Sequence, residues 1–172
     1  MEPTVLSRDM PDETARPKRS ICAITPVFNR RDLTLDCLRT LFESDLGGLD
    51  LHCIVVDDGS SDGSAAAIAD AFPQVEIITG DGTLWYSEGT NVGIRSALLR
   101  DPDYMLLYNN DSRFPRDALQ KLVSCAERHP SSLVGGVLID WDQPERIFQV
   151  GTQWQTGYGG WRTCERQTVA SL

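Results

Sequence analysis

The sequence predicts an α/β fold, a mostly parallel β-sheet with helices on both faces. Three observations support this. Short apolar runs rich in Val, Ile and Leu alternate with longer segments of helical spacing, a pattern typical of βαβ units. Two of these runs end abruptly in polar residues, one at Asp57 and Asp58 and the other at residues 109–111. The length of 172 residues and the apolar fraction of 41% are sufficient for one domain with a core.

Each expected strand is a short apolar run bounded by turn residues or by proline. The expected strands cover residues 20–25, 51–57, 75–79, 103–108, 133–139 and 146–150. The first should end at Pro26, because proline has no N–H to donate to a neighbouring strand. Helical segments separate the first four strands, so we expect these strands to run parallel.

Each expected helix carries apolar residues three and four positions apart. The expected helices cover residues 31–44, 63–71 and 87–100, and a fourth opens at Pro115. Gly47 and Pro73 mark the ends of the first two, and Ser61 or Asp62 can cap the second. The residues expected to face the core are Leu33, Cys37, Leu38, Leu41, Phe42, Val92, Leu98, Leu99, Leu119, Leu122, Val123 and Ala126.

Both ends of the chain differ in character from this region. Residues 1–19 are rich in charge and proline and lack the apolar stretch of a secretion signal. We expect them to form a flexible leader to a domain that spans residues 20–172. Residues 152–161 combine glycines with Trp154, Tyr158 and Trp161 without a clear period, which suggests a loop that shapes a pocket. A frayed tail is the alternative.

Composition argues against several classes of protein. The net charge of −9 and the pI of about 4.6 do not suit sequence-independent nucleic-acid binding, which needs clustered Lys and Arg. No apolar run approaches the roughly 20 residues that span a bilayer. The five cysteines are odd in number and lack CxxC spacing, so we expect reduced thiols and a cytoplasmic protein. The motifs HExxH and GxxxxGK[ST] are absent from the sequence.

Two carboxylates mark the end of the second expected strand. Neighbouring side chains in a strand point to opposite faces, so one of Asp57 and Asp58 should brace the following loop while the other reaches a ligand. Ligands of open α/β sheets bind outside the carboxyl ends of the strands. Taken alone, an Asx turn that serves residues 59–61 explains either acid equally well.

The fourth expected strand is followed by Asn109, Asn110 and Asp111. A carboxylate flanked by amides suits Mg²⁺ or Mn²⁺, which takes one or two carboxylates and completes its shell with water and phosphate oxygens. A polar turn is the alternative. Since parallel strands end at one sheet edge, we expect Asp58 and Asp111 to converge on one cleft that holds a cation and a phosphorylated ligand.

Two further segments carry candidate ligand contacts. After Pro26, Phe28 could stack under a planar base, and Asn29 could equally well cap the next helix. The second segment, residues 82–93, offers aromatic side chains, an amide, and glycines that permit close approach at a helix start. Its candidates are Trp85, Tyr86, Gly89, Asn91 and Gly93, and the two aromatics could equally be core residues.

In this order and spacing, the motifs resemble those of family 2 glycosyltransferases with a GT-A fold, close to the bacterial rhamnosyltransferase-like group. The resemblance covers residues 21–139 and rests on residues 24–29, 55–63, 89–94 and 107–111. It implies a nucleotide-diphosphate sugar as donor, with uracil or thymine as the base. The site residues that it implies are Pro26, Val27, Phe28, Asn29, Asp58, Trp85, Asn91, Gly93, Asn110 and Asp111.

Individual roles follow from the same resemblance. Residues 26–29 would line the base and ribose, and Asp58 would accept a hydrogen bond from the base N3. Asn91 and Gly93 would lie near the ribose or diphosphate. Residues 109–111 match a DxD-type position with Asn109 in place of the first Asp, and Asp111 would contact the diphosphate and a Mg²⁺ or Mn²⁺ ion.

The resemblance further implies transfer of the sugar, with inversion, to a hydroxyl of a glycan or lipid-linked acceptor in polysaccharide biosynthesis. Such a protein would be cytoplasmic, with peripheral placement at the inner face of the membrane as an option. The family's general base is expected beyond Leu172, so the chain is expected to be truncated and no base is assigned. A non-catalytic nucleotide-sugar-binding module or inactive fragment is the alternative. A receiver-like signalling domain is disfavoured, because no Lys lies between Arg19 and Lys121.

Overall fold

The computed structural model describes residues 19–149, 152–155 and 160–163, which fall into two compact units, 1–114 and 115–172. The predicted leader, apart from Arg19, lies outside the described residues. The elements of the first unit are β1 (Ser20–Val27), α1 (Arg31–Phe42), β2 (Asp50–Asp57), α2 (Ser64–Ala71), β3 (Glu76–Thr79), α3 (Trp85–Leu98) and β4 (Tyr104–Leu107). Those of the second are α4 (Ala118–Arg128), β5 (Leu138–Ile139), β6 (Ile147–Gln149), β7 (Thr152–Gln155) and β8 (Gly160–Thr163).

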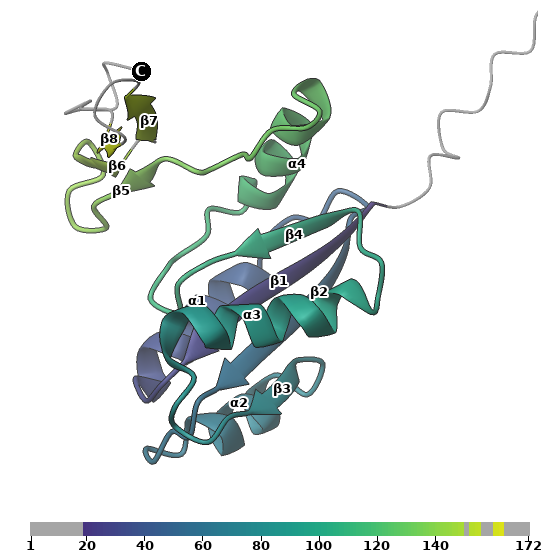
Figure 1. The fold of residues 1–172 in the computed structure, drawn as a ribbon, viewed down its shortest axis with the longest axis vertical. Coiled ribbons are helices and arrows are strands. Elements are labelled where there is room, and N and C mark those ends of the chain that lie inside the picture. Colours follow the sequence, from purple (N-terminus) through teal and green to yellow (C-terminus); the bar gives the residue numbers. More distant parts are fainter. Residues whose placement is uncertain (1–18, 150–151, 156–159, 164–172) are drawn as a thin grey trace, which may run out of the picture. The chain divides into compact units, whose positions relative to one another are not determined.

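The first unit is built on a four-stranded sheet with the order β3-β2-β1-β4, in which every pair of neighbours is parallel. Figure 1 shows α3 across one face of this sheet, with α1 and α2 on the other face. The predicted α/β fold with a parallel sheet and helices on both faces is therefore confirmed. The predicted strands and helices of this unit recur with ends shifted by one or two residues.

The core consists of two layers that follow from the alternation of side chains along the strands. On the α3 face, one buried cluster contains Cys22, Ile24, Ile54, Val56 and Ala97. The intervening residues of β1 and β2, such as Ala23 and Val55, are also buried and point to the opposite face. Both faces of the central strands are thus apolar, as a parallel sheet requires.

The expectation that Pro26 ends the first strand is wrong, because β1 continues to Val27. The N–H of Tyr108 donates to the carbonyl of Ile24, so the backbone polar groups of Ile24 point toward β4. The carbonyl of Val27 accepts from the N–H of Asp58, so those of Val27 point toward β2. By alternation, the position of Pro26 faces the β4 side, beyond the last residue of β4. The missing N–H therefore costs the sheet no hydrogen bond.

Some expected core residues are exposed, namely Leu33, Leu98 and Leu99. The side of α3 that is buried instead carries small residues, Gly89, Thr90, Gly93 and Ala97. A helix with small residues on its inner side lies close to the sheet, and its leucines remain outside. Helical spacing alone did not distinguish this side from the one that carries leucine.

The second unit departs most from expectation. Residues 133–139 form a strand at β5 alone, where Leu138 and Ile139 pair antiparallel with β6. The predicted loop over 152–161 is wrong, since β7 and β8 form an antiparallel pair in which Trp154 lies opposite Trp161. Tyr158 lies outside the described residues. Within α4, Leu119 and Val123 are buried, as predicted.

The cysteines that the structure describes are free thiols, namely Cys22, Cys37, Cys53 and Cys125. Burial raises the pKa of Cys37 and of Cys53 to about 12, so both stay protonated at neutral pH. Across the described part of the chain, no helix has the length and apolar character to cross a membrane.

Candidate functional site

The two acids at the end of β2 have different partners, as strand alternation predicts. Oδ1 of Asp57 accepts a hydrogen bond from the N–H of Ser60 at 2.9 Å, so this acid braces its own loop. The carboxylate of Asp58 accepts from the N–H of Gly82 at 2.8 Å and from the N–H of Trp85 at 2.9 Å. Both acids are buried, and Asp58 joins the end of β2 to the segment before α3.

Glycines permit this close contact between the two loops. A Cβ on Gly80 would lie 2.7 Å from Oδ1 of Asp58, so a side chain there would collide with the carboxylate. Gly59 has a φ of 76°, and its Cβ would lie 3.1 Å from the backbone nitrogen of Gly82. The loops after β2 and β3 therefore pack backbone against backbone.

A cavity of about 300 Å³ lies beside the carboxylate of Asp58, at the low end of volumes for small-molecule sites. Its lining is mostly apolar and comprises Pro26, Val27, Phe28, Asp58, Gly82, Trp85 and Tyr86. The three aromatic side chains are exposed around it, Trp85 to 81%. The cavity thus brings together five predicted site residues, Pro26, Val27, Phe28, Asp58 and Trp85.

Trp85 has a φ of 55°, which is rare for a bulky residue and costs of the order of 1–3 kcal/mol. The hydrogen bond from its N–H to Asp58 holds this conformation. The strained backbone presents a large exposed ring at the cavity wall. A buried carboxylate among aromatic rings can recognise a planar ligand that has a hydrogen-bond donor on its edge.

Asn29 does not cap α1; it anchors the loop after β2. Its N–H donates to Oγ of Ser60 at 2.7 Å, and its side-chain oxygen accepts from the N–H of Ser61 at 2.9 Å. Asn29 and Arg30 both adopt positive φ, 59° and 62°. These consecutive left-handed residues turn the chain from β1 into α1.

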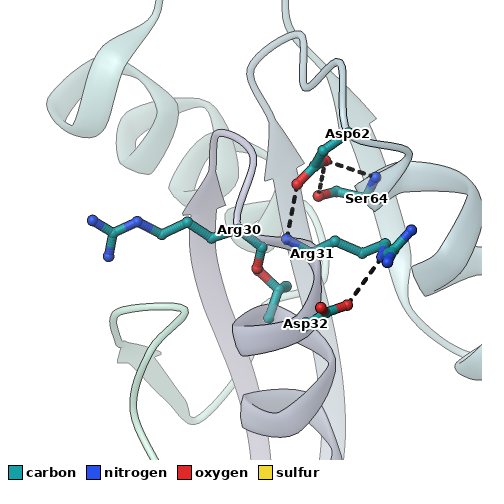
Figure 2. A network of polar contacts seen from close by, with 6 residues as sticks. Arg30, Arg31, Asp32, Asp62 and Ser64 are labelled. Carbon is teal, nitrogen blue, oxygen red and sulfur yellow. Dashed lines mark hydrogen bonds and ion pairs between the residues drawn. The ribbon is translucent and has the colours of Figure 1, made fainter.

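Asp62 joins the starts of two helices, as Figure 2 shows. Its carboxylate accepts from the N–H of Arg31 at 2.9 Å, at the start of α1. It also accepts from the N–H of Ser64 at 3.0 Å and from Oγ of Ser64 at 2.5 Å, at the start of α2. The bond from Oγ of Ser64, with those from the two backbone amides, lowers the pKa of Asp62.

The segment after β4 is held mainly by α1. The carbonyl of Asn109 accepts from Sγ of Cys37 at 3.6 Å, and Nδ2 of Asn110 donates to Oγ1 of Thr34 at 2.9 Å. Asp111 lies 3.5 Å from the guanidinium of Arg30. Of the acids Asp58 and Asp111, the described lining of the cavity includes Asp58 alone.

Two further candidates on α3 lie outside that lining. Asn91 is exposed, and its amide donates to Glu88 at 3.4 Å. Gly93 faces the sheet, where an added Cβ would lie 2.3 Å from Cγ2 of Ile24. In this structure Gly93 acts in the packing of the helix on β1.

Sequence reasoning missed several contacts that build the site. Local sequence did not indicate that Gly82 meets Asp58 or that Arg30 lies beside Asp111. Their partners lie far away in the chain, 24 residues for Gly82 and Asp58. A run of polar residues after Asp58, from Ser60 to Asp62, was the available signal that this loop receives hydrogen bonds from another segment.

The donor set for a divalent ion is small. Among residues 19–149, 152–155 and 160–163, no three His, Cys, Asp or Glu residues lie together where they could hold a metal. Asp111 is half-exposed and accessible. It fits the mode in which Mg²⁺ or Mn²⁺ takes one carboxylate from the protein and further oxygens from a bound diphosphate.

Comparisons with known proteins bear on the family and the fold of the chain. Comparison with curated proteins gave no match. The structure is similar to that of the mannosyltransferase PcManGT from Pyrobaculum calidifontis in complex with GDP-Man and Mn²⁺, with TM-score 0.56, 22% identity, and coverage of 64% of this chain and 33% of that one. TarS 1–349 of S. aureus in complex with UDP-GlcNAc gives TM-score 0.55, 15% identity, and coverage of 70% and 38%.

A third similar structure, 4-diphosphocytidyl-2C-methyl-D-erythritol synthase, gives TM-score 0.54, 20% identity, and coverage of 88% of this chain and 73% of that one. At these identities the likenesses show the fold, and the chain spans about a third of the length of PcManGT. The family model described as Glycosyl transferase family 2 matches residues 22–168, which is most of the chain. The chain therefore belongs to glycosyl transferase family 2 and has a GT-A fold.

Proposed function

We propose that the protein transfers a sugar, with inversion, from a UDP- or dTDP-sugar to an acceptor hydroxyl. The observation that carries this proposal is the cavity at the carboxyl ends of β1 and β2, which is lined by three exposed aromatic residues together with the buried Asp58. Ligands of open α/β sheets bind at this edge. Membership of the family supplies the reaction class.

The cavity lining supports a uracil or thymine base. Both bases carry an N3–H donor, whereas N3 of cytosine is an acceptor. Each oxygen of Asp58 already accepts one backbone hydrogen bond and keeps a further acceptor site. An N3–H directed at Asp58 would therefore be matched, and Phe28, Trp85 or Tyr86 would stack on the base.

In the proposed reaction the acceptor oxygen forms a bond to the anomeric carbon while the bond from that carbon to the diphosphate breaks. The electron pair leaves with the diphosphate, and the hydroxyl proton passes to a base that we do not assign. Asp111 would hold a Mg²⁺ or Mn²⁺ ion, which when bound stabilises the charge on the leaving group. Asn110 would orient the segment through its bond to Thr34.

The finer specificity is proposed from the resemblance of the motifs to the rhamnosyltransferase-like group. It favours a deoxysugar donor and a glycan or lipid-linked acceptor in polysaccharide biosynthesis. A lipid-linked acceptor would place the protein at the inner face of the membrane. The free thiols of Cys22, Cys37 and Cys53 support a reducing, cytoplasmic compartment.

Calorimetric titration with UDP, dTDP and CDP, with and without Mn²⁺, tests the proposal. We expect UDP or dTDP to bind more tightly than CDP, and Mn²⁺ to strengthen binding. Donor hydrolysis or transfer should accompany binding of the intact sugar nucleotide. Equal binding of CDP, or no binding of any nucleotide, would contradict the assignment.

The substitution Asp111→Asn tests the metal role. It should abolish the Mn²⁺ dependence of nucleotide binding, whereas Asp101→Asn, at the other end of β4, should preserve it. An unchanged Mn²⁺ dependence in Asp111→Asn would refute the role of Asp111. Metal-dependent binding without hydrolysis or transfer would identify a nucleotide-sugar-binding module.

A further inference from the structure

We propose that Arg30 binds the diphosphate of the nucleotide donor and neutralises the charge that develops there as the sugar leaves. This inference rests on the proposed function and adds a cationic side chain to the site. The protein itself would then supply part of the positive charge at the diphosphate, in addition to a metal ion.

The position of Arg30 is the first argument. It follows the cavity-lining residue Phe28 by two positions and precedes α1. Figure 2 shows its side chain extending away from the Asp62 network, whereas the side chain of the next residue, Arg31, turns toward Asp32. Nε of Arg31 lies 3.0 Å from Asp32. Two adjacent arginines thus have different surroundings, one in the helix and one beside the segment after β4.

The backbone at Arg30 is strained and held in place. Two consecutive non-glycine residues with positive φ are uncommon, and each costs about 1 kcal/mol or more. Hydrogen bonds to Ser60, Ser61 and Asp62 hold the bend from both sides. Such a conformation persists where the surrounding structure determines it, and it fixes the direction in which the Arg30 side chain leaves the chain.

The ion pair of Arg30 leaves its guanidinium able to bind another anion. The distance to Oδ2 of Asp111 is 3.5 Å, longer than the 2.7–2.9 Å of a charge-assisted hydrogen bond. The side chains are 63% and 48% exposed, so the pair is weak and solvated. The guanidinium therefore lies next to the carboxylate assigned to the metal and keeps planar donors suited to phosphate oxygens.

The charge around the site explains why such a cation is needed. The loops that surround it carry Asp57, Asp58, Asp62 and Asp111, and the whole chain has a net charge of −9. A diphosphate that approaches this edge would be repelled by the carboxylates. With one accessible carboxylate at the 109–111 segment, an arginine beside Asp111 supplies positive charge even before a divalent ion binds.

Titration with uridine, UMP and UDP in the absence of metal tests the inference. Arg30→Gln should weaken UDP binding roughly 10-fold or more, since a charge-assisted hydrogen bond is lost, and should leave uridine binding unchanged. Arg30→Lys keeps the charge without the planar donors, so its affinity for UDP should lie between those of the wild type and Arg30→Gln. The matched control is Arg31→Gln, which removes the neighbouring guanidinium and retains the backbone N–H that donates to Asp62.

Thermal unfolding of each variant checks that it folds, and Arg30→Lys provides the comparison if Arg30→Gln does not. The inference would be overturned if Arg30→Gln preferred UDP over uridine as strongly as the wild type does. That result would leave the proposed function intact. An equal loss of UDP affinity in Arg31→Gln would also overturn the inference, because the loss would then reflect the net charge of the region and not a contact made by Arg30. If the wild-type chain binds none of the three compounds, with or without Mn²⁺, the proposed function fails and the role of Arg30 fails with it.

Discussion

At the residue scale, Asp58 combines two roles that the sequence assigned to different acids. Its oxygens accept the backbone N–H groups of Gly82 and Trp85, and the same carboxylate lines the cavity. Asp57, one position earlier, braces the turn at Ser60. Asp57 and Asp58 therefore offer a matched pair of substitutions, because both are buried but only Asp58 is among the described residues that line the cavity.

Asp58→Asn should lower stability by about 1–3 kcal/mol and weaken nucleotide binding. The new NH₂ group cannot accept a hydrogen bond, so the partly buried hydrogen bond from the N–H of Gly82 or of Trp85 is lost. Asp57→Asn should behave like the wild type, since its remaining oxygen can still accept from Ser60. Urea denaturation and UDP titration measure the two effects. Equal losses in both variants would show that the carboxylates serve the loops alone.

At the scale of elements, α3 owes its position on the sheet to glycine. A Cβ on Gly93 would lie 2.3 Å from Cγ2 of Ile24, and one on Gly89 would lie 3.0 Å from Cβ of Pro26. The first contact is far shorter than van der Waals packing allows. The helix therefore lies close to β1, and the backbone near the cavity lies close to Pro26.

Gly93→Ala should destabilise the protein by about 1–2 kcal/mol, because the overpacking of Ile24 outweighs the better helix propensity of alanine. Gly135→Ala is the control, since an added Cβ there has no neighbour within 4 Å, and its effect should be within about 0.5 kcal/mol. Chemical denaturation compares the two. A Gly93→Ala variant as stable as the wild type would mean that α3 does not pack this closely.

Elements with one strong local signal could be predicted from the sequence. The apolar runs that became β1, β2 and β4 and the helical spacing of α1 located most of the first unit. Contacts across long separations could not be predicted, such as the amide of Asn29 that binds Ser61, 32 residues away. The strands β7 and β8 escaped for another reason, since each is a short, mostly polar segment that lacks an apolar run and forms a strand by pairing with the other.

At the scale of the whole molecule, Glu76 links the sheet to the end of α3. It binds His52 at 2.9 Å, Oγ of Ser96 at 2.7 Å and the guanidinium of Arg100 at 2.6 Å. Burial alone would raise the pKa of Glu76, but the hydrogen bonds from Ser96, Arg100 and His52 outweigh it and lower that pKa to about 2. The ionised carboxylate is therefore part of what stabilises the fold.

Acid should remove this stabilisation in a defined interval. The pKa of Glu76 is lower in the folded state than its ordinary value of 4.5, so its contribution is complete above pH 4.5 and is lost as the pH falls toward 2. Glu76→Gln should cost about 2 kcal/mol at pH 7 and show a smaller loss of stability between pH 4.5 and 2. Denaturation at several pH values measures both.

Glu43→Gln serves as the control, because Glu43 is exposed and the substitution makes the same change in net charge. It should reproduce the pH dependence of the wild type. If Glu76→Gln and Glu43→Gln follow the same pH dependence, general charge repulsion and not the Glu76 network governs the acid transition.

The strand order has a consequence for how the protein is made. The central strand β1 is synthesised first, while its neighbour β4 follows some 80 residues later. On the ribosome, β2 can cover one side of β1 early, but the other side keeps unpaired amide and carbonyl groups until Tyr104–Leu107 emerges. At translation rates of about 5–20 residues per second, the nascent chain spends several seconds in this state. During that interval the open side of β1 can pair with a strand of another chain, which a chaperone would prevent.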